Sequence, residues 1–245
     1  MPSFPPVMGS EPDAALGPVV GRTLAFHPSL DVKLSGRFVT IVGMTLEHIM
    51  PLYPHISGDE NAHAWDYMFY GPFNELSDFE AVMESEIENP DLVVYAILSA
   101  DQPITPSGTH NIIGCATYNN SDPKNRSIEV GVLMSPRLQR TPATTEAMYL
   151  MAKHAFEYLG YRRYEWKCDS LNTSSYRAAL RLGFTFEGTL RQHMIIKGRN
   201  RDTCWFSIVD GEWPSVKRAF EGWLDPSNFD KNGVQRKRLE EFRNT

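Results

Sequence analysis

The stretch that decides the fold is Ile128–Arg191. Its central turn reads Ser135-Pro136-Arg137-Leu138-Gln139-Arg140-Thr141-Pro142-Ala143-Thr144-Thr145-Glu146-Ala147. The apolar period predicts a strand before this turn, then a helix, a strand, a second helix and a strand. The second helix begins at Asn172-Thr173-Ser174-Ser175 and ends at Leu182-Gly183-Phe184. Unpaired backbone N–H groups and the positive dipole end meet at both helix starts. We therefore expect these starts to bind an anionic ligand, such as a pyrophosphate carried on a long amide arm.

The sequence around this stretch predicts a mixed α/β fold. A helix with an apolar stripe over residues 147–159 links the strands Ile128–Met134 and Tyr164–Cys168, which makes them parallel if they share a sheet. Upstream strands, separated by turn-rich loops at 102–110 and 119–126, indicate an antiparallel meander. We expect a mostly antiparallel sheet of about seven strands with helices on both faces. The predicted strands are 37–42, 92–98, 112–118, 128–134, 164–168, 185–196 and 203–209.

Composition divides the chain into three segments. Residues 1–30 are rich in Pro and Gly and predict an extended N-terminal arm, either a partly ordered tail or an arm that packs on a partner subunit. Residues 31–224 are expected to form one domain with a sizeable core. Residues 225–245 predict a polar C-terminal tail, in which Arg236-Lys237-Arg238 is either solvated or a localisation signal.

Composition also excludes several classes of function. The formal net charge of −6 argues against a nucleic-acid partner, which would require a basic face. No apolar run is long enough to span a membrane and residues 1–6 lack a secretory pattern, so we expect a cytoplasmic protein with no membrane partner. Cys115, Cys168 and Cys204 lie apart in apolar runs, as buried reduced cysteines do. The sequence has no dinucleotide, Walker, zinc-protease or serine-hydrolase motif, and we expect no metal site.

Glu129 and one aromatic run stand out as candidate site residues. Glu129 lies between Ile128 and Val130 in an apolar strand, where a carboxylate is costly unless it is used or paired. The strand therefore leaves two roles open: a functional carboxylate, or an ion pair with an Arg or Lys of a neighbouring strand. The aromatic run Trp65–Phe73 is either core or the wall of a substrate pocket.

Several motifs follow one another between Gly36 and Trp213: Tyr70-Gly71-Pro72-Phe73, Ile128-Glu129-Val130-Gly131, Ser135-Pro136-Arg137-Leu138-Gln139, Asn172-Thr173-Ser174-Ser175 and Arg181-Leu182-Gly183-Phe184-Thr185-Phe186-Glu187-Gly188. Through their order and spacing the chain resembles GNAT-family N-acetyltransferases, near the branch that acetylates ribosomal-protein N-termini and small amines. The resemblance implies a GNAT-like fold with a splayed parallel strand pair, acetyl-CoA as co-substrate, and direct transfer of the acetyl group to a primary amine. The acceptor would be a small-molecule amine or a protein N-terminus, and a homodimer is left open.

The resemblance also implies which residues bind acetyl-CoA. The family's pyrophosphate turn corresponds to Gln139–Thr144, where Pro142 and Thr144 replace small residues and Pro142 removes one backbone donor. Side-chain donors of the same turn would compensate for that loss. Asn172 would contact the pantetheine arm, cap its helix, or do both. The implied cofactor-binding residues are Leu133, Met134, Leu138, Gln139, Arg140, Thr141, Thr144, Thr145, Asn172 and Ser175.

For the chemistry, the resemblance implies Glu129 as the base, acting through a water. Backbone N–H groups near Leu133 or Met134 would hold the developing oxyanion. Ser175 would assist the departing thiolate, with Tyr176 as the second candidate, and a simple helix-start serine is the alternative for Ser175. Many family members carry a tyrosine acid at the position of Ala179, so that role is excluded here.

Tyr70, Phe73 and His193 are expected to line the acceptor side, with His193 as the next choice for the base. Two alternatives to an active enzyme remain because Pro142 and Thr144 depart from the family pattern. One is a catalytically silent acyl-CoA-binding module, and the other is a scaffold protein of the same fold.

Overall fold

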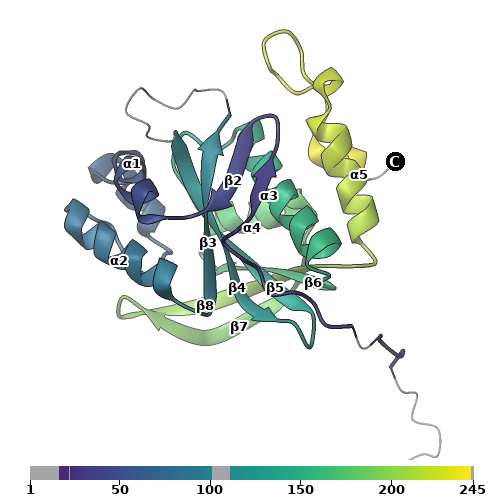
Figure 1. Ribbon diagram of the computed structural model, residues 1–245, viewed down its shortest axis with the longest axis horizontal. Coiled ribbons are helices and arrows are strands. Elements are labelled where there is room, and N and C mark those ends of the chain that lie inside the picture. The colour runs from purple at the N-terminus through teal and green to yellow at the C-terminus, as the bar shows by residue number, and fades with distance from the viewer. Residues whose placement is uncertain (1–16, 22, 101–110, 244–245) are drawn as a thin grey trace, which may run out of the picture.

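An eight-stranded mixed sheet forms the centre of the protein (Figure 1), whose computed structural model describes residues 17–21, 23–100 and 111–243. Its strand order is β1-β2-β3-β4-β5-β6-β8-β7, and every neighbouring pair is antiparallel except β5 and β6. The predicted fold class is thereby confirmed. The strands are β1 Lys33–Ser35, β2 Val39–Gly43, β3 Leu92–Ser99, β4 Ile112–Asp122, β5 Ser127–Met134, β6 Arg163–Asp169, β7 Thr185–Ile196 and β8 Arg199–Val209.

The described sheet has one strand more than the seven that the sequence predicts. The additional strand is β1, which pairs with β2 over three residues. A segment of three residues is too short to show the period-2 alternation by which strands are predicted.

Helices cover both faces of the sheet, as predicted (Figure 1). The residues of β5 alternate between two cores. Ile128 and Val130 belong to a core shared with α3, α4 and α5, whereas Leu133 belongs to a core shared with α1 and α2. The helices are α1 Ile49–Leu52, α2 Leu76–Glu88, α3 Pro142–Lys153, α4 Thr173–Leu182 and α5 Trp213–Leu224, with a π-helical turn at His154–Tyr158 after α3.

The parallel strands β5 and β6 pair over three positions only and then splay apart. The last register pair is Glu129 with Glu165. Beyond it β5 continues to Met134 and β6 to Asp169 without a strand partner on the edges that face each other. The splayed strand pair that the resemblance implies is therefore present.

The segment after α5 differs from the polar tail expected at 225–245. As far as residue 243 it folds back onto the domain through 3₁₀ turns at Pro226–Asn228 and Leu239–Phe242. Leu239 is buried in the main core. Arg243 donates hydrogen bonds to the carbonyl oxygens of Arg181 and Leu180 at the end of α4. The sequence did not reveal this packing because single residues make it, without a helical or strand period.

The described part of the N-terminal segment has no helix or strand before β1. It touches the domain where the N–H of Ala25 donates to the carbonyl of Pro123 and that of Phe26 to the carbonyl of Leu159. Residues 1–16 and 22 of the expected arm, the expected hairpin loop at 102–110, and residues 244–245 lie outside the described residues.

Candidate active site

The start of α3 is a helix N-terminus without a side-chain cap. The N-cap residue is Thr141, but its hydroxyl donates backward to the carbonyl of Leu138, over 2.7 Å. The hydroxyl of Thr144 donates to the same carbonyl. Because neither hydroxyl accepts a bond from the first turn, the backbone N–H groups there have no side-chain partner among the described residues and can bind solvent or a ligand. Pro142 fits the first helical position, where a missing N–H costs least.

Part of the predicted phosphate turn is used internally. The N–H groups of Leu138 and Gln139 both donate to the carbonyl of Ser135, and the Leu138 side chain is buried in the core. The side-chain amide of Gln139 donates to the carbonyl of Met134, over 3.2 Å. The turn therefore closes on itself, and the backbone N–H groups of Leu138 and Gln139 are already engaged inside it. Arg140 is exposed and adopts a left-handed conformation, with φ of 58°.

Thr145 also differs from its predicted role. It is buried, and its hydroxyl accepts a hydrogen bond of 3.0 Å from the guanidinium of Arg181 on α4. The residue follows Thr144 by one position, which turns its side chain about 100° around the helix into the core. Its hydroxyl therefore ties α3 to α4 and is not one of the exposed donors of the turn.

Glu146 anchors the beginning of α3 to the start of the sheet. Its buried carboxylate accepts hydrogen bonds from three consecutive backbone N–H groups, those of Arg37, Phe38 and Val39, over 2.8, 2.6 and 2.9 Å. Three donors satisfy a buried carboxylate that would otherwise be costly. The position of the α3 start relative to the sheet is thus fixed by a side chain of α3 itself.

The start of α4 meets the unpaired edge of β6. The side chain of Asn172 caps the helix by accepting a bond of 3.0 Å from the N–H of Ser175, so the predicted capping role is present. The hydroxyl of Ser175 accepts a bond of 3.0 Å from the indole N–H of Trp166. Burial raises the pKa of the Cys168 thiol to about 11, although a hydrogen bond with Ser175 opposes the shift. Ser175 thus lies beside β6 just beyond the point of splaying.

Glu129 forms the ion pair that was one of its two predicted roles. Its Oε2 atom accepts hydrogen bonds from Lys167, over 2.7 Å, and from Asn120, over 2.6 Å. The Lys167 ammonium also lies 3.2 Å from Glu165 and 3.8 Å from the centre of the Trp205 ring. Among the described residues no hydrogen bond reaches Oε1 of Glu129, so that oxygen is free to accept one.

The ion pair is part of a charged ladder across the sheet, which the sequence did not predict. Arg163 contacts Glu165 over 2.6 Å and Glu187 over 2.5 Å, and the hydroxyl of Ser207 donates to Glu187 over 2.6 Å. Arg163, Glu165 and Lys167 alternate along β6 with three buried residues. That alternation indicates one polar face, but the ion-pair partners depend on strand register.

Phe73 is a core residue, which is one of the two roles left open for the aromatic run Trp65–Phe73. It is 7% exposed and packs edge-on against Trp65, with ring centres 5.1 Å apart. Tyr70 is partly exposed, and burial, followed by the charges of Glu86 and Cys115, raises the pKa of its hydroxyl. Aromatic residues beside a Gly-Pro turn look alike in sequence, so only the fold tells which of them faces inward.

Glu86 was missed by the sequence interpretation. It follows the buried residues Phe79 and Met83 at helical spacing on α2, so a carboxyl group lies on the stripe that packs against the sheet. Burial raises the pKa of this carboxyl. The interruption of an apolar helical stripe by one acid is the signal that could have identified it.

His193 is exposed on β7, where its Nδ1 atom lies 3.0 Å from the hydroxyl of Thr203. Its ring centre is 6.2 Å from that of Trp205, the residue above which Lys167 lies. His193 is therefore linked through Trp205 and Lys167 to Glu129. An open hollow of about 880 Å³ surrounds this part of the hairpin and is lined by Thr189, Leu190, Arg191, Gln192, His193, Asn200 and Asp202.

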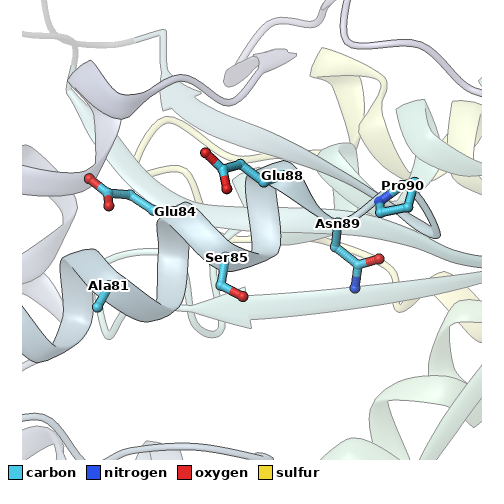
Figure 2. A pocket seen from close by; sticks show the side chains of 6 residues that line it. All are labelled: Ala81, Glu84, Ser85, Glu88, Asn89 and Pro90. Carbon is cyan, nitrogen blue, oxygen red and sulfur yellow. The ribbon is translucent and has the colours of Figure 1, made fainter.

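Figure 2 shows another hollow, of about 480 Å³, beside the end of α2. The carboxylates of Glu84 and Glu88 project there on the same side of the helix, while Ser85 points the other way. The hollow contains none of the residues predicted for the site. Within the described ranges, no group of three or more His, Cys, Asp or Glu side chains is arranged to hold a metal ion. No helix in that part of the chain has the length and apolarity needed to cross a membrane.

The chain is similar to several known acetyltransferases. A structure of a GCN5-related N-acetyltransferase from Brucella melitensis superposes with a TM-score of 0.84, at 37% identity over 91% of this chain and 98% of that chain. The N-acetyltransferase YoaA of Bacillus subtilis is 32% identical over 101 residues, or 41% of this chain and 57% of YoaA. The ribosomal-protein-serine acetyltransferase of Escherichia coli is 31% identical over 102 residues, again 41% and 57%.

These alignments span little more than half the length of the two curated relatives. The family model described as the acetyltransferase (GNAT) domain matches residues 39–185. That range is more than half of the chain and contains the splayed strands and the starts of both α3 and α4. The chain therefore belongs to the GNAT family of acetyltransferases.

Proposed function

We propose that the protein is an acetyl-CoA-dependent N-acetyltransferase that transfers the acetyl group to a primary amine by direct attack. The observation that carries the proposal is the splay of β5 from β6 after Glu129 and Glu165. Beyond that point both strands carry backbone N–H and C=O groups without a strand partner on the facing edges. The pantetheine arm of acetyl-CoA has two amide groups that suit such edges in the way an added strand would.

The residues at the start of α3 suit the pyrophosphate at the other end of that arm. Among the described residues the first helical turn has no side-chain cap. Arg137 and Arg140 are exposed in the turn before it, where the guanidinium of Arg137 donates to Asn111. A pyrophosphate accepts hydrogen bonds from free N–H groups and is favoured by the helix dipole and nearby guanidinium groups. Pro142 offers no donor, so the remaining backbone groups and the arginines carry the binding.

Glu129 and Ser175 suit the two proton transfers of the reaction. Oε1 of Glu129 accepts the proton that the ammonium group of the acceptor loses, directly or through a water. The neutral amine attacks the thioester carbonyl, so a C–N bond forms and the C–S bond breaks, and the proton that the nitrogen then loses ends on the sulfur of the free coenzyme A thiol. The hydroxyl of Ser175 accepts from Trp166 and is hydrogen-bonded to Cys168; turning its proton from Cys168 toward the departing thiolate would stabilise that leaving group. A backbone N–H near Leu133 or Met134 is the proposed oxyanion donor.

The two proposed catalytic side chains lie on opposite faces of the sheet. Glu129 shares a face of β5 with Leu133, on the side of α1 and α2. Ser175 contacts Trp166, which is buried on the side of α3 and α4. A thioester held between the splayed strands is therefore reached by the acceptor from one face and by the leaving-group donor from the other.

The charges near Glu129 support a cationic acceptor. The ladder contains three carboxylates, Glu129, Glu165 and Glu187, and two cations, Lys167 and Arg163, which leaves one net negative charge. An ammonium group is attracted to such a surface. We propose a protein N-terminus as acceptor, in line with the similarity to a ribosomal-protein-serine acetyltransferase, and a small-molecule amine as the second candidate. A cytoplasmic location fits both.

The test is an acceptor screen that measures release of free coenzyme A thiol from acetyl-CoA. Peptides with different N-terminal residues and a set of polyamines serve as acceptors. We expect turnover with at least one class and its loss in Glu129→Gln, while Glu84→Gln, an exposed acid in the hollow of Figure 2, retains it. Binding of acetyl-CoA without turnover on either class would favour the silent binding module. Absence of any binding would favour the scaffold protein.

A further inference from the structure

The tip of the β7–β8 hairpin is attached to the aromatic loop, Trp65–Phe73. The ammonium of Lys197 donates to three backbone carbonyl oxygens of this loop, those of Trp65, Gly71 and Tyr70, over 2.7, 3.0 and 3.4 Å. An ammonium group has three N–H donors, so one carbonyl oxygen is present for each of them. The two segments are more than 120 residues apart in sequence and are joined by the Lys197 side chain.

Lys197 makes these bonds from an unfavourable backbone position. Lys197 and Gly198 form a two-residue hairpin turn in which both residues have positive φ, 49° and 73°. Such a turn favours Asn or Asp before Gly, because most side chains adopt positive φ only at a cost. A lysine at this position is not explained by the turn, but its three carbonyl contacts explain it.

Arg201 makes a second attachment to the same loop. Its guanidinium lies 5.0 Å from the centre of the Phe69 ring, and one of its nitrogens lies 3.5 Å from the carbonyl oxygen of Tyr67. Its Nε atom donates to the hydroxyl of Thr203, which also contacts His193. The attachment therefore begins at the polar face of the sheet that carries His193. His193 is linked on that face to Glu129 through Trp205 and Lys167.

We infer that Lys197 is a positioning residue, which holds the aromatic loop and the hairpin tip together over the face of the sheet that bears Glu129. Trp65 and Phe73 are buried at the two ends of the loop, but Asp66 and Phe69 between them are exposed. Without the ammonium, the three carbonyl oxygens lose this donor, and Arg201 remains as the described polar contact between the hairpin and the middle part of the loop. The inference that the loop shapes the acceptor side rests on the proposed function, whereas the attachment itself does not.

Three substitutions separate the attachment from the turn. Lys197→Met keeps the aliphatic stem and removes the donors. Lys197→Asn also removes them but favours the positive φ, so it stabilises the turn while releasing the loop. Lys197→Arg restores a long cationic donor. Lys231→Met removes an exposed lysine from the segment after α5, away from the hairpin (Figure 1), and serves as the control.

Hydrogen exchange of residues 65–73, measured on the full chain without ligand, tests the attachment directly. We expect exchange on the order of tenfold faster in Lys197→Met and Lys197→Asn, and near the wild-type rate in Lys197→Arg and Lys231→Met. Unchanged exchange in both Lys197→Met and Lys197→Asn would overturn the attachment. Faster exchange in Lys197→Met but not in Lys197→Asn would show that the effect comes from the turn, and this result would also overturn the attachment.

Kinetics test the effect on the acceptor side, with the N-terminal serine peptide or polyamine that gives turnover in the screen. We expect KM for that acceptor to rise severalfold in Lys197→Met, with kcat and acetyl-CoA affinity near wild type. A looser loop with an unchanged KM would overturn the role in acceptor positioning. Absence of turnover with every acceptor would count against the proposed function, while hydrogen exchange still decides on the attachment.

Discussion

The ammonium of Lys167 lies 2.7 Å from Oε2 of Glu129, at the position where the backbone pairing of β5 with β6 ends. The ion pair thus joins the two strands by side chains immediately before they splay. Both side chains are only 12% exposed. Glu129 is therefore part of the structural support of the splay as well as the proposed base, and the two contributions can be measured separately.

The base role of Glu129 predicts a pH-dependent loss of activity. We expect Glu129→Gln to lower kcat by about a hundredfold, because a general base contributes on that order. The loss should shrink at high pH, where the amine acceptor is already neutral. Steady-state rates across pH measure this, with circular dichroism to show that the variant is folded. A variant with the wild-type pH–rate profile would leave Glu129 with the ion pair alone, and His193 would become the next candidate base.

The ion pair between Glu129 and Lys167 predicts that substitution of Lys167 lowers the stability of the protein. We expect Lys167→Met to lower the free energy of unfolding by about 3 kcal/mol, because Glu129 and Glu165 would keep largely buried charges without their cation. Urea unfolding measures this. The double variant Glu129→Gln, Lys167→Met should lose less than the sum of the two single variants, since the residues are in contact. Additive losses would show that the pair contributes no coupling.

Asn172 allows the helix cap and the contact with the cofactor to be separated. We expect Asn172→Ala to cost about 1 kcal/mol of stability through the lost cap and to weaken acetyl-CoA binding. Asn172→Asp should retain the cap, because aspartate also accepts from the N–H of Ser175, but it lacks the amide donor. Calorimetric affinities for both variants test this. Wild-type affinity in both would reduce Asn172 to its structural role.

Acetyl-CoA itself is expected to stabilise the folded protein. A ligand that binds only the folded state adds about 2.7 kcal/mol at a hundred times its dissociation constant. A thermal melt with and without acetyl-CoA measures the effect, and desulfo-coenzyme A tests whether the nucleotide and pantetheine parts suffice. No shift at saturating concentrations would contradict the proposed binding between β5 and β6.

His154 predicts a loss of stability in mild acid. Burial lowers the pKa of its imidazole below the ordinary 6.5. Below about pH 6.5 the unfolded chain therefore binds more protons than the folded one, so the unfolding free energy falls as pH falls. We expect His154→Gln to flatten this slope below about pH 6.5. His55, whose pKa is lowered by burial and then by Arg137, retains its own share. An unchanged slope would show that His154 contributes nothing to it.

The parts of the fold that depend on local sequence could be predicted, and those that depend on register could not. The cap at Asn172 and the helix end at Gly183, with φ of 101°, follow from neighbouring residues and were found in the sequence. The partner of Glu129 is Lys167, which is 38 residues away and becomes adjacent only through the pairing of β5 with β6. The sequence could indicate that Glu129 needed a partner but not which one.

The sequence did not reveal which residues of a turn, or of the aromatic run, are buried and which are exposed. Phe73 and Tyr70 are three residues apart, yet the first is core and the second is partly exposed. Thr144 and Thr145 are adjacent, yet one hydroxyl closes the turn and the other contacts Arg181. These differences depend on the rotation of a single element about its axis, which composition does not set.

The contacts of Arg243 have a practical consequence for deletion experiments. Its guanidinium holds the last carbonyls of α4, the helix whose first turn carries Asn172 and Ser175. Removing residues 239–243 is expected to fray that helix from its far end and, through the backbone, to disturb the end proposed to bind acetyl-CoA. Truncated proteins are therefore expected to bind acetyl-CoA more weakly, and this loss could be mistaken for the removal of a residue of the proposed site. Point substitutions, which leave residues 239–243 in place, avoid this error when the proposed site is mapped.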